Sequence, residues 1–216
     1  MATESPVPGA ERAYSFAKEL ILSGQLPGGS LISEGHIAER VGLSRTPVRE
    51  AFLRLQAEDL LQLFPKRGAV VVPVAPGEAE DVLDLREALE CSAVHRLLSG
   101  GTPPTDLIER MRTLVTEQAA LAEQGDLDAF VHADQAFHLG IVRASGNTLA
   151  TRFYGSLADR QRRMGMRALH PRPERLTVLV AEHTALVERI AAADEVGFAA
   201  TLRAHLDATH RTMTQR

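Results

Sequence analysis

The sequence comprises 216 residues, of which 44% are hydrophobic and 24% charged, a length that suits one large or two small globular domains. Its single cysteine, Cys91, excludes an intrachain disulfide and Cys-rich zinc or Cys-X-X-Cys redox chemistry. No apolar run is long enough to cross a bilayer and no secretory pattern opens the chain, so we predict a cytoplasmic protein without a membrane partner. The net charge of −4 at first argues against a nucleic-acid partner.

The chain opens with residues 1–9, which carry Pro, Ser and Thr without a period and are expected to form a flexible tail. A helical stripe then predicts a helix over Ala10–Ser23. A second, shorter helix is expected over Ser33–Val41, and Gly42-Leu43 turns the chain into another helical run. Helix, tight turn and helix in this order are typical of DNA-binding domains.

The stretch from Ser44 to Leu55 is expected to form the helix that reads DNA. Ser44 is a suitable N-cap, and the proline that follows lies in the first turn, where its missing N–H costs nothing. At helical period Arg45, Thr46 and Arg49 fall together near the helix start, opposite an apolar stripe. Guanidinium groups match guanine edges, and hydroxyl and N–H groups match phosphates, so this tip suits a DNA major groove. Taken alone, the stretch fits equally well an amphipathic helix with a solvated basic end.

Two short strands are expected after this helix, over Leu60–Phe64 and Ala69–Val72. The hairpin tip between them, Pro65-Lys66-Arg67-Gly68, carries two cations and is typical of a basic wing. The predicted DNA-binding domain spans residues 10–74. Residues 1–75 hold eight Lys/Arg and eight Asp/Glu, so the prediction of DNA binding rests on where the cations lie and not on net charge.

These features resemble the GntR-type winged-helix transcription regulators. The resemblance covers roughly the first third of the chain and rests on Gly24-Gln25-Leu26-Pro27-Gly28, on Leu31, on the specific run Ser44-Arg45-Thr46-Pro47-Val48-Arg49-Glu50 and on Arg67-Gly68. It implies operator contacts by Ser44, Arg45, Thr46, Arg49, Lys66, Arg67 and Gly68. Two departures stand out: Gly35 replaces a basic side chain near a phosphate, and Asp59 replaces a glycine that follows the recognition helix. Asp tolerates that second place because it visits the left-handed region readily.

Residues 75–77 are the expected linker, because Pro and Gly follow a strand there and precede a new helical period. Residues 78–216 show helical periods and no strand pattern. Six helices are expected, over about Glu78–Leu98, Thr105–Gln124, Leu127–Ala144, Thr148–Ala168, Arg172–Ala193 and Glu195–Met213. The predicted fold is therefore mostly α: a winged helix-turn-helix with three helices and a two-stranded wing, followed by an all-α bundle of six helices, with seven as the alternative.

Three of the bundle helices interrupt their apolar stripes with polar side chains. Asp134 completes the inward stripe of the third helix and His138 follows one turn later, while His183 and His205 interrupt the stripes of the fifth and sixth. A single inward histidine is more often a hydrogen-bonded core residue. An unpartnered buried carboxylate, however, would cost roughly several kcal/mol, whereas one divalent cation would satisfy all four side chains. Zn²⁺ is the favoured ion, with Ni²⁺, Mn²⁺ and Fe²⁺ as alternatives.

The second half resembles the ligand-binding helical domain of the fatty-acid-regulator branch of GntR proteins. The matching motifs are Asp134-Gln135-Ala136-Phe137-His138, Ser145-Gly146-Asn147, Glu182-His183 and His205-Leu206. The resemblance implies a metal site formed by Asp134, His138, His183 and His205. A count of six helices resembles the vanillate-regulator subgroup more than the seven-helix subgroup.

Three further residues are candidate effector contacts. The resemblance suggests that Arg86 faces an effector cavity, and a solvated arginine paired with Glu90 is the alternative. Asn147 is a helix cap that could also touch a ligand. Arg163 belongs to a run of arginines that is solvated or lies at a subunit contact, unless it clamps an anionic effector.

The predicted function is a DNA-binding transcription regulator, with repression favoured over activation. Two chains are expected to pair through their helical domains and to place their recognition helices on the half-sites of a near-palindromic operator. A small carboxylate at the metal site is expected to shift the population between forms that bind and do not bind DNA. No catalytic residue is assigned. Two alternatives stay open: a metal-dependent enzyme in which Glu182 lies near a water-activating metal, and a metal-free regulator that binds an acyl thioester.

Overall fold

The computed structural model describes residues 7–214, apart from the side chains of Pro76 and residues 210–214. Two compact units divide the chain, one ending at Val74 and the other beginning at Ala75, and each is described by itself. The tail predicted over residues 1–9 lies largely outside the described residues. Its last residue, Gly9, already begins the first helix.

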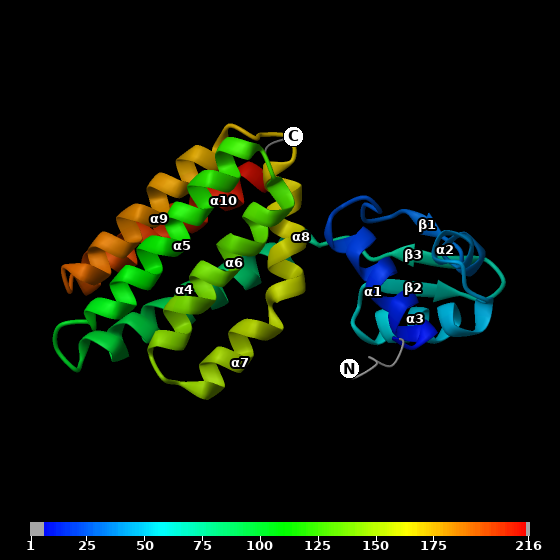
Figure 1. Ribbon diagram of the computed structural model, residues 1–216, viewed down its shortest axis with the longest axis horizontal. Coiled ribbons are helices and arrows are strands. Elements are labelled where there is room, and N and C mark those ends of the chain that lie inside the picture. Colours follow the sequence, from blue (N-terminus) through cyan, green and yellow to red (C-terminus); the bar gives the residue numbers. More distant parts are fainter. Residues whose placement is uncertain (1–6, 215–216) are drawn as a thin grey trace, which may run out of the picture. The chain divides into compact units, whose positions relative to one another are not determined.

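The N-terminal unit packs three helices against a small sheet (Figure 1). α1 lies against α3, and the small side chains of Ala13 and Ala17 on α1 share one core with Phe52 of α3. The inward stripe predicted for α3 is at most 1% exposed, which confirms that side of the helix as core. The elements of this unit are α1 (Gly9–Leu22), β1 (Leu31–Ile32), α2 (Glu34–Val41), α3 (Arg45–Ala57), β2 (Leu61–Phe64) and β3 (Gly68–Val71).

The sheet has three antiparallel strands within the described residues, in the order β1-β3-β2. The β2–β3 hairpin pairs Leu61 with Val71 and Phe64 with Gly68. The sequence predicts this hairpin but not β1, because two residues are too few to show any alternation. β1 passes so close to the hairpin that a Cβ at Gly68 would lie 2.6 Å from the carbonyl oxygen of Ile32, and Gly68 has a φ of +95°. Only glycine combines that φ with that approach.

Two residues in the left-handed conformation lie on either side of α3. Gly42, with φ 67°, ends α2, and the N–H of Leu43 donates to the carbonyl of Ala38 at 3.0 Å. Asp59, with φ 57°, follows α3, and the N–H of Leu60 donates to the carbonyl of Leu55 at 2.9 Å. Asp59 thus takes the conformation that was expected of it, and both helix ends satisfy a terminal carbonyl.

The C-terminal unit contains seven helices in its described part (Figure 1). α6 is central because it packs against α4, α5, α7 and α8, while α9 packs against α5 and α10, and α10 packs against α4. Phe130 and Phe137 on α6, with Leu186 on α9, are fully buried between these helices. The helices are α4 (Pro76–Leu98), α5 (Thr105–Gln124), α6 (Leu127–Ala144), α7 (Thr148–Ser156), α8 (Ala158–Leu169), α9 (Arg175–Ala191) and α10 (Glu195–Thr214).

The count of seven corrects the primary prediction of six. Where the sequence predicts one helix, α7 ends at Ser156 and α8 begins at Ala158. The Ser156 hydroxyl donates to the carbonyl of Phe153 at 2.7 Å, directly after Gly155. Gly-Ser pairs and hydroxyl-to-carbonyl bonds of this kind bend or end helices, which explains the break. The helix count therefore gives no support to the six-helix vanillate-regulator subgroup.

The first bundle helix begins earlier than predicted. α4 starts at Pro76, inside the expected linker, because proline is well tolerated in the first turn of a helix. None of the helices in the described part of the chain is both long and apolar enough to span a membrane.

Candidate DNA-reading surface and metal centre

The N-terminal tip of α3 presents the predicted DNA-binding side chains to solvent. Arg45, Thr46 and Arg49 are exposed, while the opposite face of α3 lies in the core. Ser44 occupies the N-cap position, but its side chain makes no capping hydrogen bond within the described structure. A helix start without a side-chain cap keeps its N–H groups available to phosphate oxygens.

Gly35 on α2 lies next to the guanidinium group of Arg45. A Cβ built at Gly35 would be 3.5 Å from Nη2 of Arg45 and 3.8 Å from Oγ of Ser33. Because glycine has no side chain, position 35 leaves open space next to the Arg45 side chain. The guanidinium group of Arg45 thus lies close to position 35.

The β2–β3 turn carries the two cations of the predicted wing. Lys66 and Arg67 are both exposed at this turn. Lys66 adopts φ 61°, and the N–H of Arg67 donates to the carbonyl of Phe64 at 3.0 Å, so the turn is tight. All the side chains predicted to contact DNA are thus displayed on α3 and on this wing, while Gly68 serves the turn itself.

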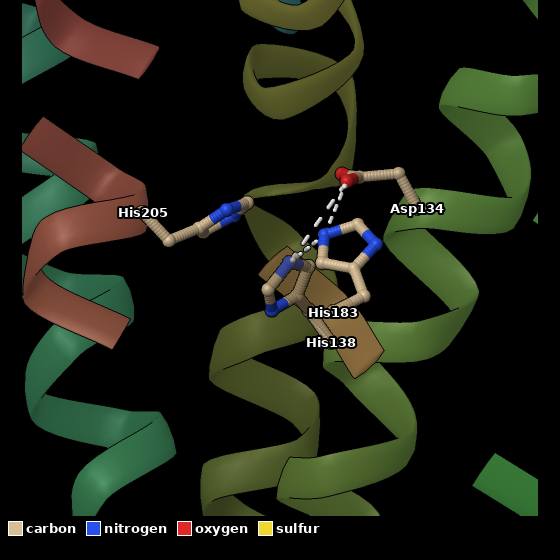
Figure 2. A group of neighbouring side chains, drawn as sticks. All are labelled: Asp134, His138, His183 and His205. Atoms are coloured by element: carbon tan, nitrogen blue, oxygen red, sulfur yellow. Dashed lines mark hydrogen bonds and ion pairs between the residues drawn. The ribbon is translucent and has the colours of Figure 1, made fainter. Parts of the chain in front are cut away.

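Four side chains of the C-terminal unit meet in its interior (Figure 2). Asp134 and His138 come from α6, His183 from α9 and His205 from α10. Their candidate ligand atoms all lie within 4.8 Å of one another, and the histidines are at most 3% exposed. Nε2 of His183 lies 3.3 Å both from Oδ1 of Asp134 and from Nε2 of His138. The structure therefore brings together all four residues that the sequence selects.

Each of the three imidazoles is fixed through its other ring nitrogen. In every case Nδ1 contacts a side-chain oxygen, and the tautomer in which Nδ1 donates to that oxygen leaves Nε2 with a lone pair. That tautomer is the one that binds a metal through Nε2, and the donor set fits a divalent cation. The three pairs are His138 with Oε2 of Glu90 at 2.7 Å, His183 with Oε1 of Gln118 at 2.6 Å, and His205 with Oε2 of Glu182 at 2.7 Å.

The surroundings of His138 and His205 also favour the neutral form of these two imidazoles. Burial lowers the pKa of His138 and of His205, and neutral imidazole is the form that ligates a metal. The amide of Gln118 is oriented by its own donation from Nε2 to the carbonyl of Ala133 at 3.1 Å, which turns its oxygen toward His183. The protein thus prepares the nitrogen lone pairs before any ligand binds.

Arg86 and Glu90 form an ion pair inside the bundle. Nε of Arg86 donates to Oε1 of Glu90 at 3.2 Å, and the hydroxyl of Tyr154 donates to the same oxygen at 2.7 Å. Arg86 is 6% exposed and Glu90 is fully buried. The Arg86–Glu90 ion pair that the sequence offered as an alternative is therefore present. It is buried in the core beside His138 and is not solvated.

A cavity of about 40 Å³ reaches two of the four candidate ligands, Asp134 and His205. Asp134, His205 and Arg86 line it, together with a mostly apolar wall. Asn147 and Arg163 are not among its described lining residues. Oδ1 of Asn147 instead caps α7, accepting from the N–H groups of the two residues after Thr148 at 3.1 Å each. Contact of Asn147 or Arg163 with an effector stays a prediction.

Sequence reasoning missed the partners that orient the histidines. The sequence places Glu182 near a catalytic metal in the enzyme alternative, whereas in the structure Glu182 holds His205. The sequence indicates Glu90 only as the partner of a solvated arginine, and it gives Gln118 no role. A signal was nonetheless present, because Gln118 follows Met111 and Val115 on the buried stripe of α5 and is itself fully buried.

The chain combines an exposed cationic helix tip and wing with an all-α unit that contains a cluster of candidate metal ligands. This combination defines the class of winged-helix transcription regulators. Residues 10–71 match the bacterial regulatory proteins of the gntR family, and residues 81–208 match the FCD domain. The chain therefore belongs to the GntR family of regulators and carries a C-terminal FCD domain.

Known relatives agree with this assignment. An uncharacterized HTH-type transcriptional regulator in an unstable DNA locus of Streptomyces ambofaciens is 33% identical over 199 residues, covering 90% of this chain and 80% of the relative. The HTH-type transcriptional repressor RspR of Escherichia coli is 27% identical over 211 residues, covering 96% and 85%. The structure of E. coli McbR/YncC shares the fold, with a TM-score of 0.72 at 23% identity over 94% of this chain and 95% of that one. These families and relatives are regulators and not enzymes, so the metalloenzyme alternative is set aside.

Proposed function

We propose that this regulator is a homodimeric, cytoplasmic repressor whose binding to a near-palindromic operator is controlled by a small carboxylate bound beside a divalent metal ion in the FCD domain. The observation that carries the proposal is the convergence of Asp134 with three imidazoles of fixed tautomer. One carboxylate with imidazole nitrogens favours Zn²⁺, with Ni²⁺, Mn²⁺ and Fe²⁺ as alternatives. The relative RspR, named as a repressor, supports repression.

Electrostatics supports a cation at this place. The Nδ1 protons are committed to Glu90, Gln118 and Glu182, so the Nε2 lone pairs and the Asp134 carboxylate face one another within 4.8 Å. The Asp134 side chain is 22% exposed, and although burial by itself raises its pKa, the neighbouring His183, His138 and Arg86 lower the pKa below its ordinary value, so the carboxylate is ionised. An ionised carboxylate beside imidazole nitrogens is a set of ligands that a divalent ion can coordinate.

The carboxylate preference comes from the cavity beside these donors. A bound metal ion would supply a Lewis-acidic position for one oxygen of the effector. Arg86 contributes from the protein side, because its Nη2 is buried and has no hydrogen-bond partner among the described residues. Such a donor costs about 1–3 kcal/mol when it stays unsatisfied, and a carboxylate satisfies it well. Glu90 keeps the guanidinium group in place by accepting from Nε.

DNA binding is assigned to α3 and the wing. In a dimer, Arg45 and Arg49 of each chain would enter neighbouring major-groove half-sites, with Lys66 and Arg67 on the flanking backbone. An effector that binds one arrangement of the dimer more tightly than another changes operator affinity by the same coupling free energy.

The test compares metal content and operator release in the full chain. His183→Ala and His205→Ala are expected to lose the ion, from about one per chain to none, and to stop responding to small carboxylates in an operator anisotropy assay. His132→Ala is the matched control, because His132 is 55% exposed and lies outside the cluster, and it should retain both properties. Unchanged metal stoichiometry in both cluster variants would rule out the proposed site.

A further inference from the structure

We infer that Leu53, in the third turn of α3, reads the C5-methyl group of a thymine in the operator and so helps to set which DNA sequence this regulator binds. The inference deepens the proposed function, on which it rests, because it concerns the reading face of the same helix. Leu53 lies outside the run from Ser44 to Glu50 and outside the set of residues predicted to contact DNA.

Leu53 is an apolar side chain that the fold leaves outside its core. The residue is 53% exposed, whereas the other apolar residues from Val48 to Leu55 are at most 1% exposed. A single exposed leucine is common on protein surfaces, so exposure alone assigns it no role. Its place on the helix decides what it can contact.

The helical period places Leu53 on the DNA-reading face of α3. Residues three, four and seven apart lie on one face of a helix. Leu53 follows Arg49 by four residues and Thr46 by seven, so these three side chains form one row. All three are exposed, and the core lies on the other side of the helix. The row that begins with the predicted DNA contacts therefore continues through Leu53.

The next residue, Arg54, marks a different side of α3, the one that α1 engages. Nη1 of Arg54 donates to Oε2 of Glu11 at 2.6 Å, and its Cζ lies 3.8 Å from the centre of the Tyr14 ring. Successive side chains on an α-helix are turned by about 100°. Leu53 is thus turned from the side that α1 engages toward the side of Arg49.

The major groove offers one apolar group to a side chain on this face. Thymine presents its C5-methyl group there, whereas the edges of guanine, adenine and cytosine present hydrogen-bond donors and acceptors. A leucine can neither donate to nor accept from those edges, and contact with them would only displace water. Contact with the methyl group instead buries apolar surface on both partners, which favours thymine.

The spacing along α3 predicts where this thymine lies. Leu53 is about 6 Å farther along the helix axis than Arg49, at about 1.5 Å per residue. This distance corresponds to about two base-pair steps of about 3.4 Å. We therefore expect the thymine within about two base pairs of the base that Arg49 contacts, once in each half-site of the operator.

The test begins with duplexes selected from a random library by the full chain. Each thymine of the selected operator is then replaced by uracil, which removes only the methyl group. Anisotropy titration of the wild-type protein should show about fourfold weaker binding at one position of a half-site, as expected for one apolar carbon group. Replacement in both half-sites should weaken binding about fifteenfold, because distant sites are additive.

Leu53→Ala should abolish this dependence on the methyl group, because the shorter side chain no longer reaches it. Uracil and thymine should then bind equally at that position, while base changes at the guanine positions weaken binding as much as in the wild type. Leu53→Gln should change the base selected at that position from thymine to adenine, the partner that glutamine recognises. Both variants should unfold at the wild-type temperature, because position 53 is exposed.

Leu31→Ala is the matched control. Leu31 belongs to the same unit and is 74% exposed, but it lies on β1 and not on α3. This variant removes an exposed leucine of equal size and should keep the preference for thymine over uracil.

Two results would overturn the inference. One is a wild-type protein for which no thymine within two base pairs of the Arg49 contact loses affinity on replacement by uracil. The other is a uracil effect that persists in Leu53→Ala, which would trace it to another side chain or to the shape of the DNA.

The proposed function fails in a different way. Arg49→Ala that binds the selected operator as tightly as the wild type would show that α3 does not read DNA. Loss of binding in Arg49→Ala without any uracil effect in the wild type would remove only the role of Leu53.

Discussion

The two units of this regulator place their functional side chains in opposite environments. In the N-terminal unit the arginines of α3 and the wing are exposed, and the core beneath them is wholly apolar. In the C-terminal unit the functional side chains lie in the interior. His138, His183, Glu90 and Gln118 are fully buried. Function and folding stability should therefore be separable in the first unit and coupled in the second.

The largest expected effect tests the N-terminal unit, in which function and folding stability should be separable. Arg45→Ala combined with Arg49→Ala should reduce operator affinity at least about thirtyfold, because each bidentate contact with a base contributes about 1–3 kcal/mol. Both side chains are exposed, so the melting temperature and the metal content should not change. Anisotropy titrations of labelled operator, beside thermal unfolding, measure the two quantities.

Arg54→Ala is the control for this double variant. Arg54 lies at the other end of α3 and pairs with Glu11 at 2.6 Å, away from the helix tip. It should bind the operator with nearly wild-type affinity. A double variant that binds the operator as tightly as the wild type would show that α3 is not the helix that reads DNA.

An intermediate effect is expected in the C-terminal unit, in which function and folding stability should be coupled. Glu182→Ala removes the acceptor that fixes Nδ1 of His205 and should weaken metal binding about 10–100-fold, as measured by competition with a chromophoric chelator. Glu182→Gln keeps an acceptor oxygen and should recover part of that loss. Glu188→Ala, on the same helix but 55% exposed and paired with Arg112, should leave metal affinity unchanged. Equal metal affinity in all three variants would show that Glu182 does not position His205.

The smallest effect concerns a polar cluster that fastens α3 to α1. The carboxylate of Glu58 accepts from the hydroxyl of Tyr14 at 2.7 Å and from Nζ of Lys18 at 2.9 Å. Burial by itself raises the pKa of Glu58, but the hydrogen bonds from Lys18 and Tyr14 outweigh it and bring the pKa below its ordinary value of 4.5.

Because the folded-state pKa is depressed, this contribution is fully present above pH 4.5 and is lost as the pH falls through the folded-state value. Glu58→Gln should lower the free energy of unfolding by about 1 kcal/mol at neutral pH, since the group is partly exposed and screened. Denaturant unfolding followed by circular dichroism at several pH values should show the difference shrinking on acidification. A difference independent of pH would contradict the assignment.

The same contrast explains what the sequence could predict. The DNA-reading tip is one contiguous run, Ser44 to Glu50, so its pattern survives any uncertainty about packing. The four metal-binding candidates were found because each interrupts an apolar stripe at helical period. Their partners Glu90 and Gln118 lie on other helices, and their roles depend on which helices become neighbours. The break before Ala158 escaped notice because Gly155 and Ser156 are also tolerated inside a helix.

That break has a consequence for the proposed effector pocket. Tyr154, on α7, helps to hold the Glu90 that orients His138, whereas Gln161 and Gly165 lie on α8, beyond the interruption. In the proposed site, a substitution on the side of α8 that lines the cavity would alter the effector pocket, while the contacts from Tyr154 to Glu90 and from Glu90 to His138 stay in place on α7, α4 and α6.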